Sequence, residues 1–108
     1  MRIFLLVCTF IIQSNASVSQ GKLIYAKECL SCHINGKYFA STKKAKEWKH
    51  LFIKKDNKDK LANLHLNIEE AKESWSYFNS QDYSHQKKHL KNLLQKYSSD
   101  RGKHNSCY

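Results

Sequence analysis

The chain carries two cysteines and a histidine in one short motif, Cys29-Leu30-Ser31-Cys32-His33, with the spacing C-x-x-C-H. On a helical turn, two thiols three positions apart can reach the two vinyl groups at one edge of a porphyrin, while the adjacent imidazole reaches the iron. This spacing is typical of covalent haem attachment. The motif therefore predicts haem c as the cofactor, with Cys29 and Cys32 as the thioether residues and His33 as the proximal iron ligand.

The N-terminal residues have the pattern of a secretory signal. Met1-Arg2 is followed by an apolar run over residues 3–12, and Ser14-Asn15-Ala16 then supplies a small-x-small cleavage pattern. The apolar run is about ten residues long, whereas a bilayer-spanning helix needs about twenty. We expect residues 1–16 to be a signal peptide that is cleaved after Ala16 and directs the protein to the periplasm. Retention as an uncleaved anchor is the alternative, and with cleavage Cys8 leaves with the signal.

Cleavage would leave 92 of the 108 residues, which is enough for one small domain. We assign residues 17–98 to this domain and residues 99–108 to a polar C-terminal tail. Small domains bury little apolar area and often depend on a metal, a disulfide or a cofactor, so we expect poor folding without haem. Cys107 in the tail would then be free or paired with another molecule, because the motif uses the other two cysteines of the mature chain.

Apolar residues recur at helical spacing along the whole domain, and no segment shows sustained strand alternation. The expected helices cover residues 22–32, 43–54, 68–78 and 84–97. Leu61, Leu64 and Ile68 form a further apolar stripe, and Asn67 with Glu70 has the pattern of a helix-capping signal. The sequence therefore predicts an all-α fold, a bundle of four to five short helices around one covalently bound haem.

Two further features surround the motif. Asn35-Gly36 is a turn signal, and the aromatic residues Tyr38 and Phe39 that follow are candidates to line the haem crevice. The formal net charge of the chain is +10, and lysines are spread along its length. This charge favours an acidic redox partner or an anionic membrane surface, with a merely solvated surface as the alternative. Nucleic acid is not expected as a partner of an exported protein.

A longer pattern, Gly21-x-x-x-Tyr25-x-x-x-Cys29-x-x-Cys32-His33, resembles the N-terminal helix of small single-haem cytochromes c. In that family the glycine lets the C-terminal helix cross closely, and the aromatic residue packs in the same contact. The resemblance implies a cytochrome c-like fold and a one-electron carrier with no catalytic residues. The residues that match the crossing partners in the last helix are Leu94 and Tyr97.

The chain departs from that family at the iron. The family has a proline that helps to orient the proximal histidine and a methionine as the sixth ligand. This chain has no proline, and its one methionine is Met1. A histidine is therefore expected as the distal ligand, and His89 and His65 are equally strong candidates because both lie on apolar faces. His85 is weaker, while His50 and His104 are expected in solvent, and a lysine ligand or an open site stays possible in principle.

Two other functions compete with electron transfer. A haem protein could instead bind or sense a small ligand at an open or displaceable sixth site. The best-known four-helix family of that kind carries its motif near the C-terminus, whereas here it lies near the N-terminus. A zinc or dithiol site would need a second ligand pair or a strand-helix-strand context, and the sequence shows neither.

Overall fold

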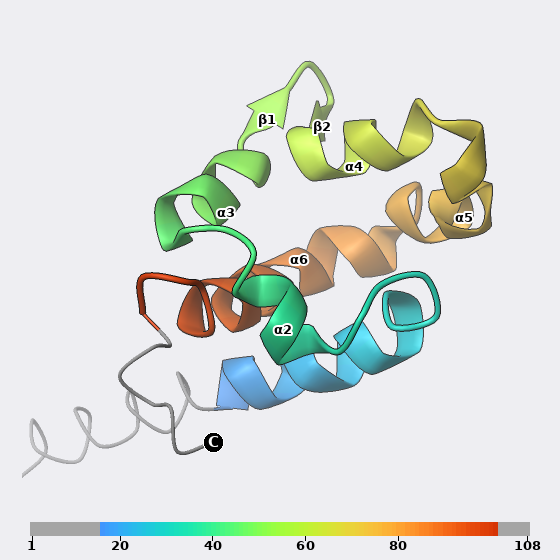
Figure 1. The fold of residues 1–108 in the computed structure, drawn as a ribbon. Coiled ribbons are helices and arrows are strands. Elements are labelled where there is room, and N and C mark those ends of the chain that lie inside the picture. Colours follow the sequence, from blue (N-terminus) through green and yellow to red (C-terminus); the bar gives the residue numbers. More distant parts are fainter. Residues whose placement is uncertain (1–15, 102–108) are drawn as a thin grey trace, which may run out of the picture.

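The longest helix, α6 (Gln81–Lys96), runs through the middle of the molecule, between the N-terminal helix on one side and α4 and α5 on the other (Figure 1). The computed structural model describes residues 16–101, and this part of the chain is mostly helical. The Ser80 hydroxyl accepts a hydrogen bond from the backbone N–H of Tyr83 at 3.2 Å and caps α6. The helix therefore begins three residues before the predicted start at residue 84.

The N-terminal helix covers residues 16–28 and crosses α6 at Gly21. A methyl group at Gly21 would overlap the backbone carbonyl of His89 and lie 2.9 Å from Cβ of Leu93. The close crossing expected at this glycine is therefore present. Its contacts differ from the expected ones, because Gly21 meets Leu93 and the His89 backbone, while Leu94 lines the cavity described below.

The chain then passes through a series of short elements. They are α2 (Gly36–Ala40), α3 (Ala45–Leu51), a hairpin of β1 (Lys54–Lys55) and β2 (Lys58–Asp59), α4 (Lys60–Leu66), the 3-10 helix η1 (Glu69–Ser74) and α5 (Trp75–Phe78). The two strands pair antiparallel, with Lys54 opposite Asp59 and Lys55 opposite Lys58. Asp56 at the tip adopts a positive φ of 65°, which is the backbone conformation that such a tight turn requires.

Several of these elements correct the prediction. The hairpin was not expected, and Asn35 begins helix α2, because its side chain accepts a hydrogen bond from the Tyr38 N–H at 2.9 Å. The predicted helix over 68–78 is a 3-10 helix followed by one turn of α-helix. Asn67 ends α4 and does not cap the next helix, which starts after Ile68 without a side-chain cap.

A buried carboxylate connects α4 to α6. Asp59, of which 1% is exposed, caps α4 by accepting a hydrogen bond from the Ala62 N–H at 2.8 Å. The Tyr83 hydroxyl lies 2.8 and 3.0 Å from the two carboxylate oxygens, and Lys87 Nζ lies 3.5 Å from Oδ2. A charged group this deeply buried needs such partners, and together they hold the start of α4 against α6.

The remaining predictions concern the ends of the chain. Residues 1–15, with Cys8 and most of the predicted signal, and residues 102–108, with His104 and Cys107, lie outside the described residues. Ser99 donates its N–H to the Lys43 carbonyl at 2.9 Å, and the Asp100 carboxylate accepts from the Ala45 N–H at 2.9 Å. The start of the predicted tail therefore packs against the start of α3. Among residues 16–101, no helix combines the length and apolar character needed to cross a membrane.

Candidate functional site

A cavity of about 370 Å³ lies between the C-x-x-C-H turn and α4, with α3 and α6 behind it. Both cysteines of the motif, His33 and His65 line it. Its other walls are mainly apolar and include Tyr25, Phe39, Trp48, Leu51, Leu61, Leu64, Ile68, Phe78, Leu90 and Leu94. A volume of this size, apolar walls and a few polar groups are the usual properties of a small-molecule or cofactor site.

The motif forms a tight turn directly after the N-terminal helix. The Cys29 N–H donates to the Tyr25 carbonyl at 2.8 Å, and the His33 N–H donates to the Cys29 carbonyl at 2.9 Å. These helix-like hydrogen bonds bring the side chains of Cys29, Cys32 and His33 to the same cavity. The predicted helix over 22–32 ends at residue 28, so the motif follows the helix as a turn.

Phe39 supports the ring of His33. The two ring centroids lie 4.5 Å apart with an interplanar angle of 30°, and the Trp48 ring lies behind Phe39 at 5.3 Å. The indole N–H of Trp48 donates to the Ala40 carbonyl at 2.8 Å, which fixes the stack. Burial, and then the nearby His65, lower the pKa of His33, so the ring is neutral near pH 7 and has a lone pair for a metal.

His65 faces His33 across the cavity and is held by three partners. Its Nδ1–H donates to the Leu61 carbonyl at 2.8 Å, its ring stacks on Phe78 at 4.3 Å, and its own carbonyl accepts from the Trp75 indole N–H at 2.7 Å. The centroids of the His33 and His65 rings lie 6.1 Å apart. Because a carbonyl only accepts, Nδ1 of His65 carries a proton, and this hydrogen bond leaves Nε2 unused.

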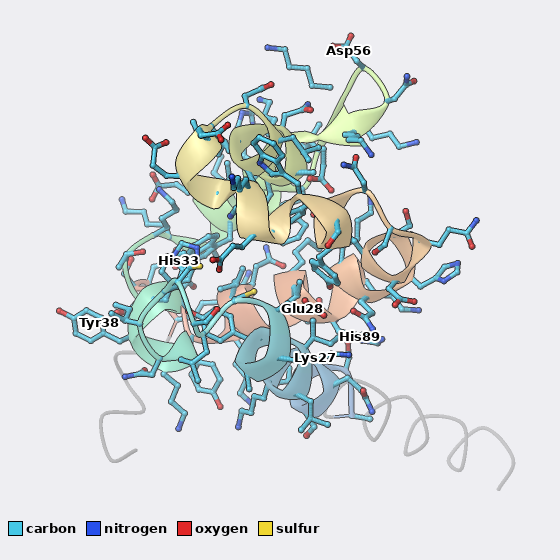
Figure 2. The ribbon with its side chains drawn as sticks, turned by 90° about the vertical axis from the view of Figure 1, so that its right-hand side faces the viewer. Lys27, Glu28, His33, Tyr38, Asp56 and His89 are labelled. Atoms are coloured by element: carbon cyan, nitrogen blue, oxygen red, sulfur yellow. The ribbon has the colours of Figure 1, made fainter. Side chains whose placement is uncertain are left out.

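The structure places two predicted site residues away from this cavity. His89 does not line the cavity: its Nδ1 lies 2.8 Å from the Ser17 hydroxyl, and Figure 2 draws it right of the centre, whereas His33 lies on the left. Its position on α6 faces the N-terminal helix that crosses at Gly21. Tyr38 is 64% exposed and points outward, so Phe39 alone of this aromatic pair contacts the site (Figure 2).

The other histidines in the described part of the chain also lie outside the cavity. His85 is exposed, and His50 on α3 is exposed with its Nε2 2.6 Å from Lys60 Nζ. Trp75 and Phe78 were expected on one helix face, but their contacts with His65 were not foreseen. Their spacing of three residues, which places both on one helix face, was the available signal.

The two thiols differ in their surroundings. Burial, followed by the charges of Glu28 and Cys32, raises the pKa of Cys29 to about 12, whereas Cys32 is exposed. A thiol with a raised pKa is a poor nucleophile at neutral pH, unlike the cysteine of a thiol-disulfide enzyme. Within residues 16–101, no group of three or more His, Cys, Asp or Glu side chains is arranged to hold a metal ion by itself.

The mouth of the cavity carries charges of both signs. Glu28, Lys43 and Glu70 line it together with Leu64 and Ile68, whose side chains are 55% and 49% exposed. Two large apolar side chains so exposed beside an apolar cavity are the kind of surface that a ligand covers.

Comparisons of this chain with protein-family models, with curated proteins and with solved structures found no match. The cavity and its residues are therefore the basis for the proposed function.

Proposed function

We propose that this protein is an exported one-electron carrier that holds one haem c in the cavity, bonded to Cys29 and Cys32, with His33 as the proximal ligand. One observation supports it above the others: the two thiols, His33 and a second histidine open into the same apolar cavity. The motif resembles that of small cytochromes c, and we propose that the function is also similar.

The chemistry of the donor set fits haem. A c-type haem needs two thiols at one edge and an imidazole below the ring, and the turn at residues 29–33 supplies all three to one cavity. Cys29 and Cys32 would hold the group through thioethers, each formed by adding one S–H across a vinyl double bond, so that attachment would need no oxidant.

A bound haem would supply an iron centre that alternates between two oxidation states one electron apart. The residues of the chain do the rest. Phe39 and Trp48 hold the His33 ring, and the leucines of α3, α4 and α6 exclude water. Cys32 is exposed and marks the side from which a partner would approach. No group needs to act as an acid, a base or a nucleophile, so we propose a carrier and not an enzyme.

The proposed partner is an acidic redox protein or an anionic membrane surface, met in the periplasm. The net charge of +10 favours encounter with either. Charges at the cavity mouth are mixed, so the steering would come from the wider surface, where lysines are numerous.

The test is to export the full chain in cells that mature c-type cytochromes and to record its visible spectrum in alkaline pyridine. We expect the spectrum of a haem with two thioether bonds and a reversible one-electron titration. The double variant Cys29→Ala/Cys32→Ala should lose the colour, while Cys107→Ala should keep it. Colourless wild-type protein, or colour that organic solvent extracts, would contradict the proposal.

A further inference from the structure

We infer that His65 is the sixth ligand of the haem iron and that it binds through Nε2. The inference rests on the proposed function, because it concerns the distal side of the same site. It selects one of the two candidates that the sequence left equal, and it gives α4 a role in the site.

The rings of His33 and His65 are spaced like two ligands of one metal ion. Metal–imidazole bonds are about 2 Å long, so two imidazoles on opposite sides of one ion place their ring centroids roughly 6 Å apart. The centroids of His33 and His65 lie 6.1 Å apart in the structure. This separation is the one that two imidazoles on one metal ion would have, and the planes of the two rings lie at 81°.

The other ring nitrogen of His65, Nδ1, makes a hydrogen bond. Metal-bound histidines usually donate their second N–H to a carbonyl or a carboxylate, which fixes the tautomer and the orientation of the ring. His65 already makes this hydrogen bond, from Nδ1 to the Leu61 carbonyl at 2.8 Å. Phe78 stacks on the ring, and Trp75 holds the His65 backbone. The ligand is thus oriented by the protein itself.

The helix that carries His65, α4, is attached to α6. Asp59 caps this seven-residue helix and is bound from α6 by Tyr83 and Lys87. His65 lies near the other end of α4, so the buried carboxylate fixes the helix that carries it. His89 does not line the cavity, and its Nδ1 lies 2.8 Å from the Ser17 hydroxyl.

Lys43 is the one remaining side chain of the cavity wall with a nitrogen that could bind iron. Its Nζ lies 5.9 Å from the centroid of the Trp48 ring, on the α3 side of the cavity. A lysine ammonium has three donors and no lone pair. Lys43 is therefore the competing outcome in the experiment below.

The experiment uses the haem-loaded full chain and compares His65→Ala with the matched control His89→Ala. We expect the ferric wild type and His89→Ala to be low-spin, with the near-infrared magnetic circular dichroism band of two axial histidines. His65→Ala should be high-spin, should bind carbon monoxide rapidly once reduced, and should return to the low-spin spectrum when imidazole is added.

The wild-type spectrum keeps the inference testable even if His65→Ala does not fold. A His/Lys band, a high-spin ferric wild type, or a low-spin spectrum lost in His89→Ala and kept in His65→Ala would each overturn it. The pyridine spectrum of the same samples reports covalent haem independently. Covalent haem with a wrong axial band contradicts only the role of His65, whereas absence of haem contradicts the proposed function.

Discussion

The N-terminal helix and α6 are in close contact at Gly21, which leads to a specific prediction for Gly21→Ala. The added methyl group would overlap the carbonyl oxygen of His89, lie 3.1 Å from the His89 carbonyl carbon and lie 2.9 Å from Cβ of Leu93. Two of these three atoms belong to the backbone of α6. A rotamer change therefore cannot relieve the overlap, and the two helices must move apart.

The size of the effect follows from two opposing terms. Overpacking of a well-packed contact costs about 1–3 kcal/mol. Replacing glycine by alanine inside a helix returns about 0.5–1 kcal/mol of backbone entropy. The net loss is about 1–2 kcal/mol, which for a domain of this size lowers the midpoint of thermal unfolding by roughly 4–15 °C.

Gly36→Ala is the matched control. A methyl group at Gly36 would meet the Tyr25 ring at 3.4 Å, which is an ordinary contact, so this variant should keep or slightly raise the unfolding midpoint. Both midpoints would be measured by far-ultraviolet circular dichroism on the proteins as purified. Equal shifts in the two variants, or a raised midpoint for Gly21→Ala, would refute the crossing described here.

Three further predictions concern other parts of the structure. Tyr83→Phe should cost about 1–3 kcal/mol in denaturant unfolding, because it leaves the buried Asp59 carboxylate short of a donor; an unchanged midpoint would show that the pair does not support α4. In haem-free protein that circular dichroism shows to be folded, iodoacetamide near pH 8 should modify Cys32 before Cys29, whose pKa is raised to about 12 by burial; peptide mapping that finds the reverse order would contradict this. The backbone N–H of Ala45 lowers the pKa of Asp100, so its stabilisation is present above the unfolded pKa and is lost as pH falls through the folded one. The free energy of unfolding of the wild type should therefore fall more below about pH 4 than that of Asp100→Asn. Parallel pH profiles of the two proteins would count against the cap.

The sequence predicted the parts of the fold that depend on local pattern. Periodicity indicated the helix that precedes the motif, whereas the close crossing at Gly21 was implied by the resemblance of the Gly21-to-His33 pattern to small cytochromes c. Helical periodicity also located α6 and the region of α3. The ends of the helices were predicted less accurately. Capping by Ser80 and Asn35 depends on backbone geometry that periodicity does not reveal.

The sequence could not choose between His65 and His89, because both lie on apolar helix faces. The choice depends on which part of the fold each helix face packs against. His89 lies near the crossing with the N-terminal helix, whereas His65 turns toward Phe78 and the cavity. The partners of Asp59 were equally invisible, since Tyr83 and Lys87 lie more than twenty residues away along the chain. Tertiary contacts of this kind set the distal side of the candidate site.

The central claim is that the motif at residues 29–33 holds a porphyrin by two covalent bonds. The most direct measurement is the mass of the denatured protein, purified from cells that mature c-type cytochromes, followed by fragmentation of the peptide that contains the motif. We predict the mass of the polypeptide plus one intact haem, with no hydrogen lost, and with the added mass on Cys29 and Cys32. A mass equal to that of the bare polypeptide, or haem mapped to another part of the chain, would contradict the account.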